Sequence, residues 1–124
     1  MEQNKKQKAS INYNNGKIYK IVNDINDKIY IGNSTTKLSK RLSDHKKIGK
    51  KDKEKPFYKD LFENVGKEHF SIILIEECPC NSKLESEKRE YEIIQQHSRE
   101  LGRDKIYNLQ NVKDKLKDVE GHQA

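Results

Sequence analysis

Two tyrosines, Tyr19 and Tyr30, stand in short segments that alternate apolar with polar residues, at 17–22 and 28–32. Such segments predict two strands, and the turn-forming residues 23–27 between them predict a hairpin. A turn centred on Asp24 and Ile25 would pair Tyr19 directly with Tyr30 and place both phenols on one face, together with Lys17 and Gly32. Two phenols side by side could take part in chemistry, but aromatic pairs across strands are also common where they serve packing alone.

An arginine and a histidine follow the hairpin at helical spacing. Ser34 to Thr36 offer hydroxyls that can cap a helix start, and residues 37–47 predict a helix with Leu38 and Leu42 as its apolar stripe. Arg41 and His45 are four residues apart and flank this stripe, so we expect both to point toward the body of the domain. The planar guanidinium suits a phosphate and the imidazole can move protons near neutral pH, although such a pair is often surface decoration.

A later helix carries the acidic candidates. Residues 82–85, Ser-Lys-Leu-Glu, form a capping box that predicts a helix over 83–96. Its buried stripe is predicted as Leu84, Tyr91 and Ile94. Glu90 stands at the edge of this stripe, but spacing alone does not separate it from Glu87.

The remaining elements complete an α+β pattern. Pro56 suits the first turn of a helix that ends at Gly66, and residues 69–77 predict a third strand. Its unbroken apolar run, 72–75, is typical of a strand covered on both faces, so we expect it in the middle of the sheet. The order predicts a small three-stranded, mostly antiparallel sheet flanked by about three helices. Residues 1–15 are interpreted as a flexible polar tail and 110–124 as a charged C-terminal tail.

Charge favours a nucleic-acid partner. The 124 residues carry a net charge of +6, and residues 1–60 hold 16 Lys and Arg against 7 Asp and Glu. A basic half on one small domain is typical of nucleic-acid binders, although a solvated Lys-rich surface explains it nearly as well. The candidate phosphate-contacting lysines are Lys17, Lys46, Lys47, Lys50 and Lys51.

Composition also limits the cellular setting. No apolar run is long enough for a membrane span, so we expect no membrane partner. Cys78 and Cys80 flank one proline, a spacing that suits neither a zinc knuckle nor a comfortable disulfide. We interpret them as free thiols in a reducing intracellular compartment, the cytoplasm or nucleus.

Together these motifs resemble one family. Residues 16–19, Gly-Lys-Ile-Tyr, and 30–32, Tyr-Ile-Gly, are similar to the paired motifs of the GIY-YIG nuclease superfamily, with Lys17 in place of the first motif's glycine. Arg41 and His45 match the next motif, Glu90 with Ile94 the acidic motif, and Tyr107-Asn108 the last. The resemblance covers residues 16–108 and predicts a nuclease domain over 16–109.

The resemblance implies a metal-dependent endonuclease that hydrolyses phosphodiester bonds of DNA. Its implied catalytic residues are Tyr19 as general base, Tyr30, Arg41, His45, Glu90 and Asn108, with Glu90 holding one Mg²⁺ or Mn²⁺ ion. A domain without a recognition module is expected to nick with low sequence specificity, and a protein partner could choose the site. The alternative is an inactive nucleic-acid-binding module of the same fold. The residues do not choose between homing, restriction, repair and recombination, nor do they indicate an oligomeric state.

Overall fold

The computed structural model describes residues 12–48 and 54–110. The strands and helices are β1 (Lys17–Asn23), β2 (Tyr30–Ser34), α2 (Leu38–Ile48), α3 (Pro56–Lys59), β3 (Phe70–Glu77) and α4 (Lys83–Leu101). Short 3₁₀ turns precede β1, β3 and the last described segment, and α3 continues into one π-helical turn, Asp60–Asn64. The predicted α+β architecture with a three-stranded antiparallel sheet is confirmed.

The central strand is β1, because the sheet order is β2-β1-β3. The prediction that the apolar run of β3 lies in the middle was wrong: β3 is an edge strand, and its Ile73 and Leu74 are 43% and 41% exposed. Ile18, Tyr19 and Ile21 of β1 have no exposed surface. Apolar content therefore indicated a strand correctly but carried no information on strand order, which depends on how the helices cover the sheet.

The hairpin register differs by two residues from the predicted one. Tyr19 pairs with Gly32, and Tyr30 pairs with Ile21. The connection is longer than the predicted turn because the Asn23 side-chain oxygen accepts the backbone N–H groups of Ile25 and Asn26, at 2.9 and 2.7 Å. A shift of two residues keeps every side chain on its face, so both tyrosines still point to the same side of the sheet.

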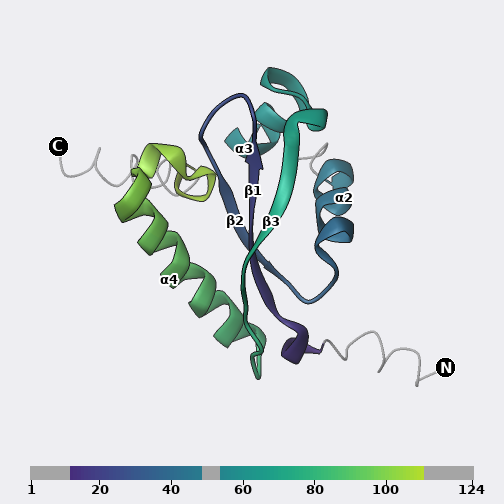
Figure 1. The fold of residues 1–124 in the computed structure, drawn as a ribbon, viewed down its shortest axis with the longest axis vertical. Helices are drawn as coiled ribbons and strands as arrows, with labels where there is room; N and C mark the ends of the chain where they lie inside the picture. The colour runs from purple at the N-terminus through teal and green to yellow at the C-terminus, as the bar shows by residue number, and fades with distance from the viewer. Residues whose placement is uncertain (1–11, 49–53, 111–124) are drawn as a thin grey trace.

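Helices cover both faces of the sheet. In Figure 1 the sheet stands between α4 on one side and α2 on the other. Ile18 and Ile31 pack on the α4 side with Ile93, whereas Tyr19 and Ile21 pack on the opposite side with Phe57 of α3. No helix in the described ranges is long and apolar enough to cross a membrane.

Helix α4 is rotated relative to the prediction. Ile94 is buried as expected, but Leu84 and Tyr91 are 75% and 62% exposed, and the buried positions are Ser86, Ile93 and Ile94. This orientation turns Glu90 inward, because it lies one helical turn from both Ser86 and Ile94.

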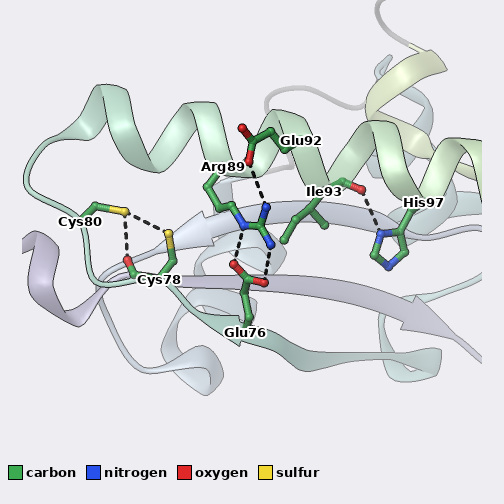
Figure 2. A network of polar contacts seen from close by, with 7 residues as sticks. All are labelled: Glu76, Cys78, Cys80, Arg89, Glu92, Ile93 and His97. Atoms are coloured by element: carbon green, nitrogen blue, oxygen red, sulfur yellow. Dashed lines mark hydrogen bonds and ion pairs between the residues drawn. The ribbon is translucent and has the colours of Figure 1, made fainter.

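A charged contact ties α4 to β3. Arg89 donates two hydrogen bonds to the Glu76 carboxylate, from Nε at 2.6 Å and from Nη2 at 2.9 Å, and a third to Glu92 at 2.9 Å. Figure 2 shows the guanidinium between the two carboxylates. The Arg89 hydrogen bonds hold the pKa of Glu76 below its usual value.

The start of the described chain is packed against the loop before α4. The backbone N–H groups of Cys78 and Cys80 donate to Gly16 and Tyr13, each at 2.8 Å. Both cysteines are buried free thiols, and their side chains lie beside each other in Figure 2. The other residues of the two predicted tails, 1–11 and 111–124, lie outside the described residues.

The outer edge of β2 is closed by a side chain. Asn108 Nδ2 donates to the Ile31 carbonyl at 2.7 Å, and its Oδ1 accepts the Ile31 N–H at 2.8 Å. Nearby, Ile29 forms a parallel bridge with Ile106. The amide of Asn108 thus replaces one residue of a neighbouring strand and satisfies backbone groups that would otherwise stay unpaired.

We predict that Asn108→Asp lowers the free energy of unfolding by about 1–3 kcal/mol. The carboxylate keeps the bond from Ile31 N–H but loses the donor to the Ile31 carbonyl and faces it with a negative charge. Urea denaturation measures the change. Asn14→Asp, at an exposed position, is the matched control, and equal stability of both variants would contradict the edge-closing role of Asn108.

Candidate active site

The site is organised around the ring of Tyr19, which crosses from β1 over β2. A Cβ built on Gly32 would lie 2.6 Å from Tyr19 Cζ and closer still to the hydroxyl oxygen. Any side chain at position 32 would therefore displace the ring. This close approach gives a physical reason for glycine at the end of the Tyr-Ile-Gly segment.

The Tyr19 hydroxyl meets both candidate residues of α2. Arg41 Nε donates to it at 3.2 Å, and His45 Nε2 lies 2.8 Å from it. Arg41 and His45 project from the same face of α2, as their spacing predicted. Tyr19 has no exposed surface, and Gly32, Arg41 and His45 surround its hydroxyl oxygen.

The second tyrosine joins this group through its ring. Tyr30 lies edge-on to His45, with 5.2 Å between ring centroids, and stacks on Phe57 at 4.5 Å. Tyr19 and Tyr30 are therefore not directly opposed, but both contact the same imidazole. Tyr19 is also edge-on to His45, with 6.1 Å between the ring centroids.

A third phenol, which the sequence did not single out, completes the surroundings of His45. The Tyr58 hydroxyl of α3 lies 2.8 Å from His45 Nδ1. His45 is only 3% exposed, so both ring nitrogens are engaged inside the protein. No spacing rule connects residues 45 and 58, because they stand in different helices, α2 and α3.

Burial controls the protonation of these groups. It raises the pKa of Tyr19 to about 12, although the nearby Arg41 charge acts in the opposite direction. It also raises the pKa of Tyr30 well above its usual value. Burial and the Arg41 charge lower the pKa of His45 to about 4. At neutral pH both phenols are protonated and the imidazole is neutral.

Glu90 approaches from the opposite side of the sheet. Asn33 of β2 donates from Nδ2 to Glu90 Oε1. Burial raises the pKa of the Glu90 carboxyl, while the hydrogen bond from Asn33 and the charge of Arg41 oppose that shift. The alternative acid, Glu87, is exposed and pairs with Lys83 at 3.8 Å. Of the two, Glu90 is the one directed at this region.

A groove lies between α2, β2 and the start of α4. Its volume is about 320 Å³, and its lining includes Arg41 from α2 and Asn33 from β2. The other lining residues are Tyr13, Ser34, Thr35, Thr36, Asp44 and Lys83. A ligand in this groove can contact the side chains of Arg41 and Asn33 at once, and Asn33 in turn binds Glu90.

The donor set suits a weakly ligated hard cation. Within residues 12–48 and 54–110 no three His, Cys, Asp or Glu side chains gather into a metal-binding group. One half-buried carboxylate beside an amide matches the habit of Mg²⁺, which keeps several waters and takes few protein ligands. Glu90 therefore fits such an ion, whereas a zinc site would need more nitrogen or sulfur ligands.

The other candidate residues do not contact the Tyr19 hydroxyl in the part of the chain that the structure describes. Asn108 contacts the backbone of Ile31 and not the tyrosines. Lys17 Nζ donates to the Asn15 carbonyl at 3.0 Å, and Lys46 and Lys47 stand in the last turn of α2. Lys50 and Lys51 lie outside the described residues.

Comparison with known proteins identifies the family. Residues 15–108 match the family model of the GIY-YIG catalytic domain. The chain belongs to this family of nuclease catalytic domains. GIY-YIG nucleases generally depend on a divalent metal.

One viral protein is similar in sequence. The chain is 33% identical over 82 residues to "Uncharacterized protein 019R" of Invertebrate iridescent virus 6. The alignment covers 66% of this chain and 29% of the viral protein. No solved structure matches the chain.

We predict that Gly32→Ala lowers the free energy of unfolding by about 1–3 kcal/mol, since the enclosed Tyr19 ring cannot yield to the added methyl group. A double-mutant cycle with Tyr19→Ala, followed by urea denaturation, checks the cause. Once the ring is gone, Gly32→Ala should cost little. An equal cost in both backgrounds would show that the strain lies elsewhere.

We also predict a loss of stability in acid that depends on His45. Its pKa in the folded protein, about 4, lies below its ordinary value of 6.5, so the unfolded chain binds a proton first as the pH falls. The contribution is complete above pH 6.5 and is lost toward pH 4, by up to about 3 kcal/mol. Urea denaturation of wild type and His45→Gln from pH 7.5 to 4 measures it. The variant should show a shallower decline, and parallel curves would contradict the prediction.

Proposed function

We propose that this protein is a divalent-metal-dependent endonuclease that nicks DNA, with little sequence preference of its own. The observation that carries the proposal is the groove lined by Arg41 and Asn33. Arg41 also donates to Tyr19, which contacts His45, and Asn33 also binds Glu90. Phosphodiester hydrolysis needs an activated water, stabilisation of charge on the phosphate oxygens and support for the leaving oxygen. The site has a candidate group for each.

Arg41 is the proposed phosphate clamp. Its Nε is engaged by Tyr19, and the terminal nitrogens of the fork can donate to two non-bridging oxygens. Lys83, Thr35 and Thr36 line the same groove and can contact the backbone on either side of the scissile phosphate. The basic half of the chain, with Lys17, Lys46 and Lys47, would add attraction to DNA.

Tyr19 is the proposed general base. With its pKa near 12, the phenol does not lose its proton to bulk water at neutral pH. It can act by passing its own proton to His45 Nε2 while it takes one from the attacking water. Because Tyr19 is fully enclosed, we expect a bound phosphate to draw the Arg41 side chain aside and open this route. Tyr30 would orient the water.

Glu90 is the proposed metal ligand, and Asn33 holds one of its oxygens so that the other can face the ion. A bound Mg²⁺ or Mn²⁺ would supply positive charge to the phosphate and the leaving oxygen. Asn108 would support the site indirectly, by fixing the β2 edge.

The low sequence preference is proposed because the family match assigns residues 15–108 to a catalytic domain and to no recognition module. We propose that recognition of a sequence or DNA structure rests with elements or partners outside this domain. One site cuts one strand, so a nick is the expected product. The free thiols Cys78 and Cys80 favour a reducing compartment, the cytoplasm or nucleus.

The alternative is a nucleic-acid-binding module without activity. One observation favours it: Tyr19 has no exposed surface in this conformation. The alternative predicts DNA binding that is independent of Glu90 and no cleavage with any divalent ion.

We predict that wild-type protein nicks supercoiled plasmid with Mg²⁺ and not with EDTA. Tyr19→Phe and Glu90→Gln should each lower the nicking rate at least about 100-fold, as loss of an acid–base or charge-stabilising group does. Glu87→Gln and Tyr91→Phe make the same changes at exposed positions and should leave the rate unchanged. If wild-type protein binds DNA but never cuts it, the binding module is the better account.

A further inference from the structure

His45 is held between two phenols from different elements. Tyr19 of β1 lies 2.8 Å from Nε2, and Tyr58 of α3 lies 2.8 Å from Nδ1. The other ionisable groups around the imidazole are Tyr30 of β2 and Arg41 and Asp44 of α2. The imidazole is almost completely buried, so its two partners decide which nitrogen carries the proton.

The two tautomers differ in what Tyr19 can do. With the proton on Nδ1, His45 donates to the Tyr58 oxygen, and Nε2 is free to accept from the Tyr19 hydroxyl. With the proton on Nε2, His45 donates to Tyr19 and cannot take its proton. The Tyr19 oxygen already accepts from Arg41 Nε, which favours a Tyr19 hydrogen that points at His45.

We propose that Tyr58 is a positioning residue that keeps His45 in the Nδ1–H tautomer, so that Nε2 can accept the Tyr19 proton as Tyr19 takes one from the attacking water. This inference rests on the proposed nuclease function. Its logic is that of catalytic triads, in which a third group orients the imidazole and stabilises the imidazolium that forms.

The proton steps balance. As the water oxygen bonds to phosphorus, one of its protons moves to Tyr19 Oη, and the original Tyr19 proton moves to His45 Nε2. The P–O3′ bond breaks with its electron pair on O3′, which takes a proton from solvent. The imidazolium donates from Nδ1 to Tyr58 meanwhile, and later releases its extra proton to solvent by way of Tyr19.

The position of Tyr58 is well supported by packing. Its ring packs on Phe57, with 5.0 Å between centroids, and stacks with Phe62 at 6.3 Å. Phe57 in turn stacks on Tyr30. One helical turn therefore holds both the Tyr58 hydroxyl and the second tyrosine of the site relative to His45.

Solution NMR of ¹⁵N-histidine-labelled protein tests the tautomer without substrate or metal. His45 is identified among the four histidines by the signal that His45→Gln removes. Wild type should show the proton on Nδ1, and Tyr58→Phe should shift the population toward Nε2–H. Tyr91→Phe, at a 62% exposed position, should leave the signals unchanged.

The proposal fails if wild-type His45 carries its proton on Nε2, or if Tyr58→Phe leaves the tautomer unchanged. The wild-type spectrum alone decides the first point should Tyr58→Phe not fold. In nicking assays Tyr58→Phe should lower kcat about tenfold or more with KM unchanged. A changed tautomer with a wild-type nicking rate would overturn the proposed proton path. If wild-type protein does not nick DNA, the proposed function is wrong, but the NMR result on the tautomer remains valid.

Discussion

The site depends on the contact between the Tyr19 ring and the backbone of Gly32. Because position 32 has no side chain, the phenol can cross the neighbouring strand and bring its oxygen to α2. There it meets Arg41 and His45, which one helical turn places side by side. A larger residue at position 32 would move the hydroxyl away from both partners. The geometry of a strand pair thus determines whether three residues from β1 and α2 can share one hydrogen-bond network.

Burial of this network has two opposite effects on function. It excludes water, so each hydrogen bond is electrostatically stronger than on the surface, and every polar group needs a partner. Among the described residues no fully buried side-chain nitrogen or oxygen lacks one. The same burial keeps both phenols protonated and the imidazole neutral, so no single group is a strong base at rest. The proposed proton transfer would therefore place a transient positive charge on the buried His45 ring, which its contact with Tyr58 would stabilise.

The sequence predicted residues better than it predicted their arrangement. The two tyrosines shared a face and Arg41 and His45 shared a helix side, because those properties follow from the periods of strands and helices. The hairpin register was wrong by two residues, since it depended on how the Asn23 side chain organises the loop. The place of β3 and the rotation of α4 were wrong as well, since the exposed Leu84 and Tyr91 have the same apolar character as buried residues. Neither Asn33 nor Tyr58 could be found by spacing, because each contacts a residue far away in the chain.

Strand β2 explains how these separate contacts become one site. Four consecutive residues each hold a different candidate group: Tyr30 contacts His45, Ile31 binds the Asn108 amide, Gly32 lies under Tyr19, and Asn33 binds Glu90. Alternation along the strand sends residues 30 and 32 toward α2 and residues 31 and 33 toward the α4 side. A site on one face of the sheet could not use Glu90, which comes from the other side. Because β2 is an edge strand, α4 and α2 can both reach past it to the groove, and the Asn108 amide protects the edge that this arrangement leaves open. Glu90 and Tyr19 are thus each joined to a residue that lines the groove, Glu90 to Asn33 and Tyr19 to Arg41.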